Sequence, residues 1–233
     1  MGDATIVGSG LIARAFAKHL PDLAGTCIYA AGVSNSSCQD DIEFARDSLR
    51  LSETLSRTAP SQLFVYFSTC SVLDPWSENS AYCLHKRKLE EVVRSRDRSL
   101  VIRLPQVAGE TPNPHTILNY LFNRIVRSER FDLWRNATRN IIDVDDVAKI
   151  IVDFIRNEYT RAETVNVANA ANSTLFEIVS AIETATRRTA IYNSVDRGGD
   201  YQIDTSRIAD SVRRCDINFD QEYLLRTVAK YYG

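Results

Sequence analysis

The sequence predicts an α/β fold, in which a parallel sheet carries helices on both faces and a small mixed lobe follows. Three observations support this prediction. Short apolar runs typical of buried strands alternate with stretches in which apolar residues recur at helical spacing. A glycine turn follows the first run, and from about Phe131 onward the alternation gives way to a mixed pattern.

The predicted elements follow one another without an internal repeat or a low-complexity linker. Apolar runs predict strands at residues 5–7, 26–31, 63–67, 100–104 and 164–167. Helical spacing predicts helices at residues 11–20, 40–57, 80–94, 116–126, 143–155 and 173–186. Ligands of such sheets bind outside the carboxyl ends of the strands, so we expect the functional residues there.

The composition excludes several classes of protein. With 233 residues and a net charge of only -2, the chain can bury a sizeable core and does not look like a nucleic-acid binder. Its five cysteines are irregularly spaced without a CxxC pair, which argues against a disulfide framework or a metal site and favours a reducing, cytoplasmic compartment. No apolar run approaches the ~20 residues needed to cross a bilayer, so we expect no membrane association.

The first strand is followed by the sequence Gly8-Ser9-Gly10-Leu11-Ile12-Ala13, a GxGxxA turn that opens a helix. In this position backbone amides can hold the pyrophosphate of a dinucleotide. The turn alone is weak support, because tight glycine turns occur in many α/β proteins.

A tyrosine and a lysine are spaced as YxxxK in the helix predicted at residues 80–94. The spacing places Tyr82 and Lys86 one turn apart on the same face. An ammonium group beside a phenol favours the phenolate, so the pair can move a proton to or from a carbinol oxygen. Hydroxyls at residues 68, 69 and 71 end the preceding strand and can reach the same oxygen, although serine and threonine commonly end strands.

Together these motifs resemble the extended short-chain dehydrogenases/reductases, in the branch of nucleotide-sugar epimerases, dehydratases and reductases. The resemblance implies a Rossmann-like sheet, an NAD(H) or NADP(H) cofactor and a catalytic set of Thr69, Tyr82 and Lys86. Thr69 is preferred to its serine neighbours because of its register with Val72. The cofactor-binding residues implied by the resemblance are Gly8, Gly10, Leu11, Ile12, Ala30, Ala31, Gly32, Tyr82, Lys86, Leu104 and Pro105.

Three further segments resemble those that contact the substrate in this family. Residues 103–109 (RLPQVAG) resemble its RxxNVxG stretch, residues 139–147 (RNIIDVDDV) its RDFIHVDDV segment, and residues 197–200 (RGGD) its RxGD segment. A planar guanidinium can bind phosphate oxygens with two parallel hydrogen bonds. Each arginine taken alone is also consistent with a surface ion pair. The implied substrate-binding residues are Thr69, Ser71, Gln106, Arg139 and Arg197.

The sequence also departs from the family pattern. About two N-terminal strands and a helix are lacking between the first helix and the strand near Thr26, and these normally carry the residue that separates NAD from NADP. The loop after Thr69 is short, and Gln106 stands where asparagine is common. The 4,6-dehydratases have an acidic pair where this chain has Cys70 and Ser71, so dehydration is disfavoured.

The sequence therefore predicts a nucleotide-sugar 4-ketoreductase or 4-epimerase dependent on NAD(P)(H). The alternative is a catalytically inactive relative that binds a nucleotide sugar or dinucleotide as a regulatory or scaffolding protein. We expect a cofactor domain of residues 1–112 with 140–167, and a substrate-binding lobe of residues 113–139 and 168–233. By analogy with many relatives, we expect a homodimer formed through the helices at residues 40–57 and 80–94.

Overall fold

Five parallel strands form the central sheet of the computed structural model, which describes residues 2–233. The strand order is β1-β2-β3-β4-β9, with every neighbouring pair parallel. The strands are β1 (Thr5–Val7), β2 (Thr26–Tyr29), β3 (Leu63–Thr69), β4 (Ser99–Leu104) and β9 (Glu163–Asn166). The predicted parallel sheet is confirmed, and β1 lies at its edge.

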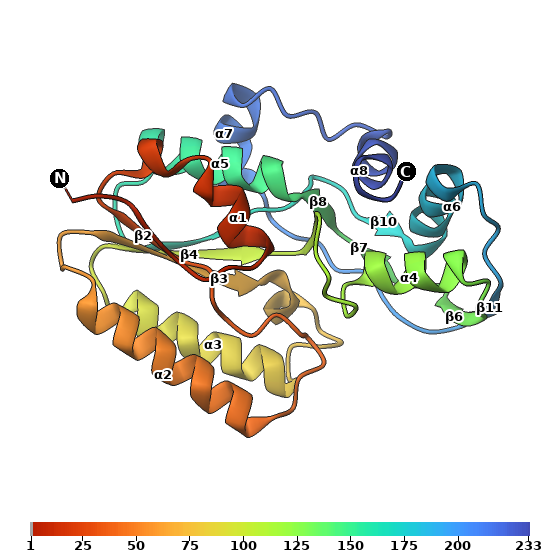
Figure 1. The fold of residues 1–233 in the computed structure, drawn as a ribbon, viewed down its shortest axis with the longest axis horizontal. Helices are drawn as coiled ribbons and strands as arrows, with labels where there is room; N and C mark the ends of the chain where they lie inside the picture. Colours follow the sequence, from red (N-terminus) through yellow and green to blue (C-terminus); the bar gives the residue numbers. More distant parts are fainter. Residues whose placement is uncertain (1) are drawn as a thin grey trace.

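Helices cover both faces of this sheet (Figure 1). Helices α1 (Leu11–Ala17) and α5 (Val144–Asn157) lie on one face, and α2 (Asp41–Arg57) and α3 (Ala81–Arg94) lie side by side on the other. Alternate residues of each strand face opposite sides. Ile28 and Val65 pack in the core under α1 and α5, whereas Tyr29, Phe64 and Tyr66 pack in the core under α2 and α3.

Capping residues explain where the predicted helices begin. Asp40 and Ser80 accept hydrogen bonds from backbone N–H groups of the first turns of α2 and α3, so each helix begins one residue later than predicted. Thr174 caps α6 (Leu175–Thr186) in the same way and forms a reciprocal capping box with Glu177. The first predicted helix ends early at Ala17, and a short 3-10 helix, η1 (Leu20–Leu23), follows it.

The second part of the chain packs α4 (Ile117–Val126), α6 and α8 (Tyr223–Tyr232) around a separate apolar core. Six short strands, none of them predicted, form three pairs: β5 (Gln106–Ala108) with β8 (Ile141–Asp143), β6 (Phe131–Trp134) with β11 (Tyr192–Val195), and β7 (Thr138–Arg139) with β10 (Ser173–Thr174). Strands this short show no readable periodicity in the sequence.

The C-terminal segment contacts both parts of the molecule. Helix α7 (Ala209–Arg214) packs on α5, and η3 (Ser206–Ile208) before it adds Ile208 to the core under α1 and α5. Helix α8 packs in the separate core of the second part. The domain boundaries given above stay a proposal, which the two separate cores support in outline. In the described part of the chain, no helix is long and apolar enough to cross a membrane.

Candidate active site

One cavity of about 430 Å³ lies at the carboxyl ends of β1 to β4. The predicted site residues that line it are Gly8, Gly10, Leu11, Ile12, Ala30, Ala31, Gly32, Thr69, Ser71, Tyr82, Lys86, Leu104, Pro105 and Gln106. The structure therefore brings the glycine turn, the strand-end hydroxyls and the YxxxK pair to one place, although they are far apart in the sequence.

Glycines allow the backbone to come close at one end of this cavity. Gly8 has a φ of 121°, and a Cβ there would lie 2.3 Å from the carbonyl oxygen of Ala30 at the end of the neighbouring strand. A Cβ at Gly10 would meet nothing within 4 Å, so this wall of the cavity is open backbone. Such a surface, free of side chains, suits the close approach of a diphosphate.

Thr69, Tyr82 and Lys86 lie together at the other end of the cavity. Thr69 ends β3, and α3 carries Tyr82 and Lys86 in its first two turns. The Lys86 Nζ atom is 5.7 Å from the centroid of the Tyr82 ring and 5.4 Å from that of Tyr66. Thr69, Tyr82 and Lys86 are only 7%, 7% and 3% exposed, so they face the cavity from packed positions.

The surroundings of Ser68 support Thr69 as the strand-end hydroxyl that reaches a substrate. Ser68 donates a hydrogen bond of 2.6 Å to Oε1 of the fully buried Glu90, which engages its hydroxyl. Arg103 holds the same carboxylate through two hydrogen bonds of 2.9 and 2.7 Å. The Thr69 hydroxyl accepts a hydrogen bond from the Ser71 N–H at 3.1 Å, which leaves its own proton to donate.

The protonation of the YxxxK pair differs from the expectation. We expected Lys86 to lower the pKa of Tyr82, but burial raises the pKa of this phenol, and a hydrogen bond with Thr69 only partly opposes the rise. Burial also lowers the pKa of Lys86, and the negative charges of Asp47 and Glu90 oppose that fall. Tyr82 is therefore protonated at neutral pH and can act as a proton donor.

The two predicted phosphate-binding arginines lie outside the cavity. Arg139 is half-buried on β7, where its Nη1 donates to the Thr138 carbonyl at 2.6 Å. Arg197 is exposed on the loop that follows β11. Asp200 of the same segment is anchored, because Thr138 donates a hydrogen bond to its carboxylate and Asn172 donates another at 2.8 Å.

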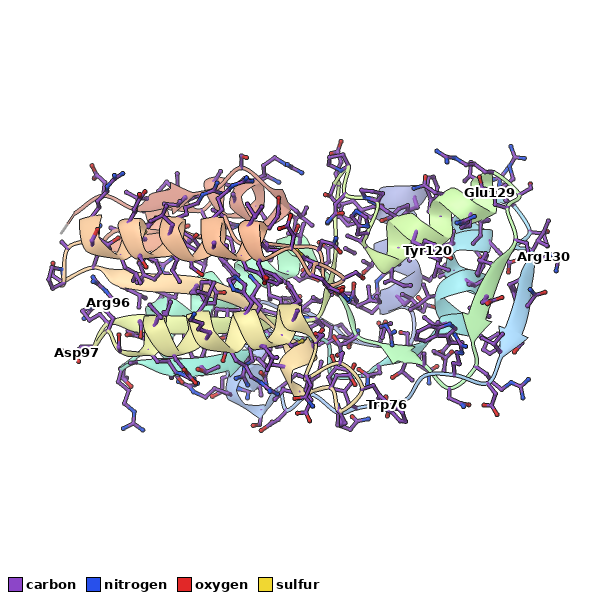
Figure 2. All side chains as sticks on the ribbon, turned by 90° about the horizontal axis from the view of Figure 1, so that it is seen from below. Trp76, Arg96, Asp97, Tyr120, Glu129 and Arg130 are labelled. Atoms are coloured by element: carbon purple, nitrogen blue, oxygen red, sulfur yellow. The ribbon has the colours of Figure 1, made fainter. Side chains whose placement is uncertain are left out.

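The loop after β3 reaches the segment at residues 197–200. A Cβ at Gly199 would lie 2.1 Å from Nε1 of Trp76, so only glycine allows this approach. Trp76 lies at the junction of the sheet and the second core (Figure 2). The RxGD-like segment is thus placed next to the loop that begins at the cavity, although its arginine is not brought into it.

Several cavity-lining residues were not found by sequence reasoning. Their polar side chains come from the loop after β2, from α2 and from the loop before α4: Ser34, Ser36, Arg50, Thr111, Asn113, His115 and Thr116. The run of polar residues from Thr111 directly follows a predicted strand-end segment, which is a signal that could have been used. Arg50 lies in the middle of a helix, and no local pattern marks it.

Comparison with known proteins agrees with this arrangement. The sequence model described as the NAD dependent epimerase/dehydratase family matches residues 3–168. The chain belongs to this family. The membership confirms the resemblance drawn from the motifs and the expected class of NAD(P)-dependent enzymes.

Solved structures of low sequence identity share the fold of this family member. RMD from Pseudomonas aeruginosa, complexed with NADPH, is 15% identical with a TM-score of 0.76, and the match covers 99% of this chain and 98% of that one. WbmH from Bordetella bronchiseptica, in complex with NAD+, is 17% identical with a TM-score of 0.74 over 99% and 97%. The UDP-N-acetylglucosamine 4-epimerase from Methanobrevibacter ruminantium, in complex with UDP-N-acetylmuramic acid, is 16% identical with a TM-score of 0.67 over 89% and 76%. No curated protein sequence matches the chain.

Proposed function

We propose that the chain is an NAD(P)(H)-dependent 4-ketoreductase or 4-epimerase of nucleotide sugars. One observation carries this proposal: a single cavity is lined by the glycine turn at one end and by Thr69, Tyr82 and Lys86 at the other. The glycine turn at one end suits the diphosphate of the cofactor, and the catalytic side chains at the other end suit its nicotinamide. When bound, the nicotinamide ring accepts and returns a hydride.

The residues of the chain divide the remaining work. Tyr82 donates a proton to the carbonyl oxygen of a keto sugar during reduction, and accepts it in the reverse direction. Thr69 donates a hydrogen bond to the same oxygen, and Lys86 supplies positive charge beside the phenol and holds the nicotinamide ribose. The protonated state of the buried Tyr82 phenol supports this donor role.

The cofactor fits the open backbone of the cavity. Gly8, Gly10 and the strand-end segment at residues 30–32 would hold its diphosphate side, with Leu11 and Ile12 against it. Leu104 and Pro105 would pack by the nicotinamide. These roles rest on the family resemblance and on the shared cavity.

A nucleotide sugar is the proposed substrate because polar side chains line the catalytic end of the cavity and two arginines lie outside it. Ser71 and Gln106 line the cavity beside Thr69, and Arg139 and Arg197 lie on the second part of the molecule, beyond it. Guanidinium groups suit the diphosphate of such a substrate. The Methanobrevibacter epimerase, which has the same fold, holds a nucleotide sugar.

The experiment that tests the proposal is a screen of purified protein with nucleotide sugars. Nucleotide-linked 4-keto sugars are offered with NADH or NADPH, and the loss of reduced-nicotinamide absorbance reports reduction. Nucleotide sugars are offered in parallel with NAD+, and sugar analysis by NMR reports inversion at C4. Turnover in either arm supports the proposal. Absence of both activities across the panel, from folded protein, contradicts it.

One observation favours the alternative, a relative that binds without catalysis. β1 is an edge strand whose residues are at least partly exposed, so within residues 2–233 no further strand covers the side of the cavity proposed for the adenosine. Calorimetric titration separates the two functions. Saturable binding of a nucleotide sugar with no affinity for NADH or NADPH would establish the binding protein and remove the enzyme.

We also propose that the chain forms a homodimer through α2 and α3. These helices lie side by side on the outer surface (Figure 1). Each exposes large apolar side chains. Ile42 and Leu49 of α2 are 70% and 61% exposed, and Leu84 and Val92 of α3 are 51% and 39% exposed. Light scattering is expected to give twice the chain mass, and a Leu49→Lys variant is expected to be monomeric. A wild-type monomer at working concentration contradicts the proposal.

A further inference from the structure

A buried carboxylate lies directly behind the catalytic lysine. Asp47 of α2 is 4% exposed and accepts three hydrogen bonds: from His85 Nε2 at 3.0 Å, from the Val33 N–H at 3.1 Å and from the Tyr29 hydroxyl at 3.4 Å. Its donors come from α3, from the loop after β2 and from β2 itself. Asp47 thus fixes the loop that lines the cofactor cavity to the helix that carries the YxxxK pair.

The Lys86 ammonium group lies near this carboxylate, beyond the distance of a direct ion pair, and the two charges interact through space. A Cβ placed on Gly32 would be 2.8 Å from Lys86 Nζ, 3.5 Å from Asp47 Oδ2 and 3.7 Å from Asp47 Oδ1. Gly32 therefore lies over the two opposite charges, and its lack of a side chain leaves room for the lysine to pass. The rings of Tyr66 and Tyr82 also lie close to Lys86 Nζ.

Two carboxylates act on the charge of Lys86, Asp47 more strongly than Glu90, and they differ in their other partners. Glu90, one turn further along α3, is already neutralised by its paired hydrogen bonds from Arg103 and takes a further one from Ser68. Asp47 is bound instead by a ring nitrogen, a backbone amide and a phenol. The backbone amide and the phenol are uncharged donors, and the positive charge of Lys86 acts on Asp47 in addition to its hydrogen bonds.

The energetics require such a partner. An isolated ammonium group buried in apolar surroundings loses its proton, and burial does lower the pKa of Lys86. Burial likewise raises the pKa of Asp47, but the hydrogen bond from His85, the charge of Lys86 and the Val33 amide outweigh it, so this pKa lies below its ordinary value. Each charge of the pair is thus stabilised by the other.

We propose that Asp47 is the counter-ion that keeps Lys86 in the ammonium form within the cavity, and that it acts on the reaction only through Lys86. Asp47 is a positioning residue, because it does not touch the cavity itself. The consequence for turnover rests on the proposed function. The charge of Lys86 is a property of the protein alone, so the counter-ion proposal and the proposed function can fail separately.

The experiment follows the charge of Lys86 directly. The chain contains only five lysines, so 13Cε-labelled lysine gives a spectrum in which Lys86 is assigned from a Lys86→Met variant. Its pKa is read from a pH titration of wild-type protein and of Asp47→Asn, which keeps the size of the side chain and the oxygen that accepts from His85 and Val33. We expect the pKa of Lys86 to fall in Asp47→Asn, because the variant loses the opposite charge that favours the ammonium form.

Two variants serve as controls. Asp41→Asn makes the same chemical change at an exposed position of the same helix, and it should leave the titration of Lys86 unchanged. Asp47→Glu restores the charge and should restore the titration towards that of the wild type. If Asp47→Asn does not fold, the reciprocal measurement applies: Lys86→Met should raise the pKa of the Asp47 carboxyl, followed by 13C labelling.

The outcomes are distinguishable. A titration of Lys86 that is the same in wild type and folded Asp47→Asn overturns the proposal, as does an unchanged Asp47 pKa in Lys86→Met. If the titration shifts and the enzyme turns over, the alkaline limb of the kcat/KM profile should move to lower pH in Asp47→Asn. If it shifts but wild type binds no dinucleotide, the counter-ion stands and the proposed function fails.

Discussion

Two regions differ in how firmly their side chains are packed: the sheet end, which is the catalytic end of the cavity, and the lobe end, which carries the two candidate arginines. At the sheet end, Thr69, Tyr82 and Lys86 are at most 7% exposed, and Glu90 and Asp47 behind them are fully hydrogen-bonded. At the lobe end, the candidate arginines are half-buried or exposed and come from a two-residue strand and a loop. Packing therefore fixes the side chains proposed to react, whereas the arginines proposed to bind the nucleotide are less buried.

The largest effect is expected at the sheet end. Tyr82→Phe removes the proton donor but keeps the ring in its packed position, so kcat should fall about 10²- to 10⁴-fold with the fold unchanged. Tyr120→Phe makes the same change on an exposed tyrosine of α4 and should leave kcat unaltered. Equal rates for Tyr82→Phe and wild type would remove the difference between the two ends.

The packed charges behind the site should dominate stability. Glu90→Ala leaves Arg103 half-buried without its carboxylate, and this should lower the free energy of unfolding by about 3–5 kcal/mol in urea denaturation. Glu129, which Figure 2 labels, pairs with Arg124 where both side chains are exposed, and Glu129→Ala should cost about 0–1 kcal/mol. Similar losses in the free energy of unfolding for the two variants would show that the buried ion pair at the sheet end stabilises the fold no more than the exposed one.

Changes at the lobe end should affect binding rather than chemistry. Arg197→Ala removes one proposed phosphate contact, so KM for the nucleotide sugar should rise about 10-fold while kcat stays the same. Arg188→Ala, another exposed arginine of the same part, is the matched control and should change neither constant. A fall in kcat without a change in KM would assign Arg197 to the reaction instead.

The smallest effect concerns the segment that joins the two parts. Arg214 of α7 donates to Asp153 and Glu158 of the sheet part; burial raises the pKa of both carboxyls, but these hydrogen bonds outweigh it and the values are lowered. A carboxyl whose pKa is lowered by folding adds stability at pH values above its pKa in the unfolded chain. This stability is lost as the pH falls through the pKa of the carboxyl in the folded protein. Melting temperatures should therefore drop less below about pH 4 in Arg214→Met than in wild type. A steeper drop in the variant would contradict this.

The same contrast explains what the sequence could predict. The sheet end follows from local patterns: buried runs mark the strands, Gly8 marks a backbone with positive φ, and YxxxK marks one helix face. Asp47 and His85, 38 residues apart, have no such pattern, because only the packing of α2 against α3 brings them together. The paired short strands of the lobe depend likewise on distant partners, so the positions of Arg139 and Arg197 could not be derived.

Titration calorimetry with NADH and NADPH tests most directly whether the cavity is a nicotinamide site. Wild-type protein should bind at least one of the two at one site per chain. Binding should persist in Tyr82→Phe and should be lost in Gly8→Ala, whose Cβ would lie 2.3 Å from the Ala30 carbonyl oxygen. Folded wild-type protein that binds neither dinucleotide would contradict the account.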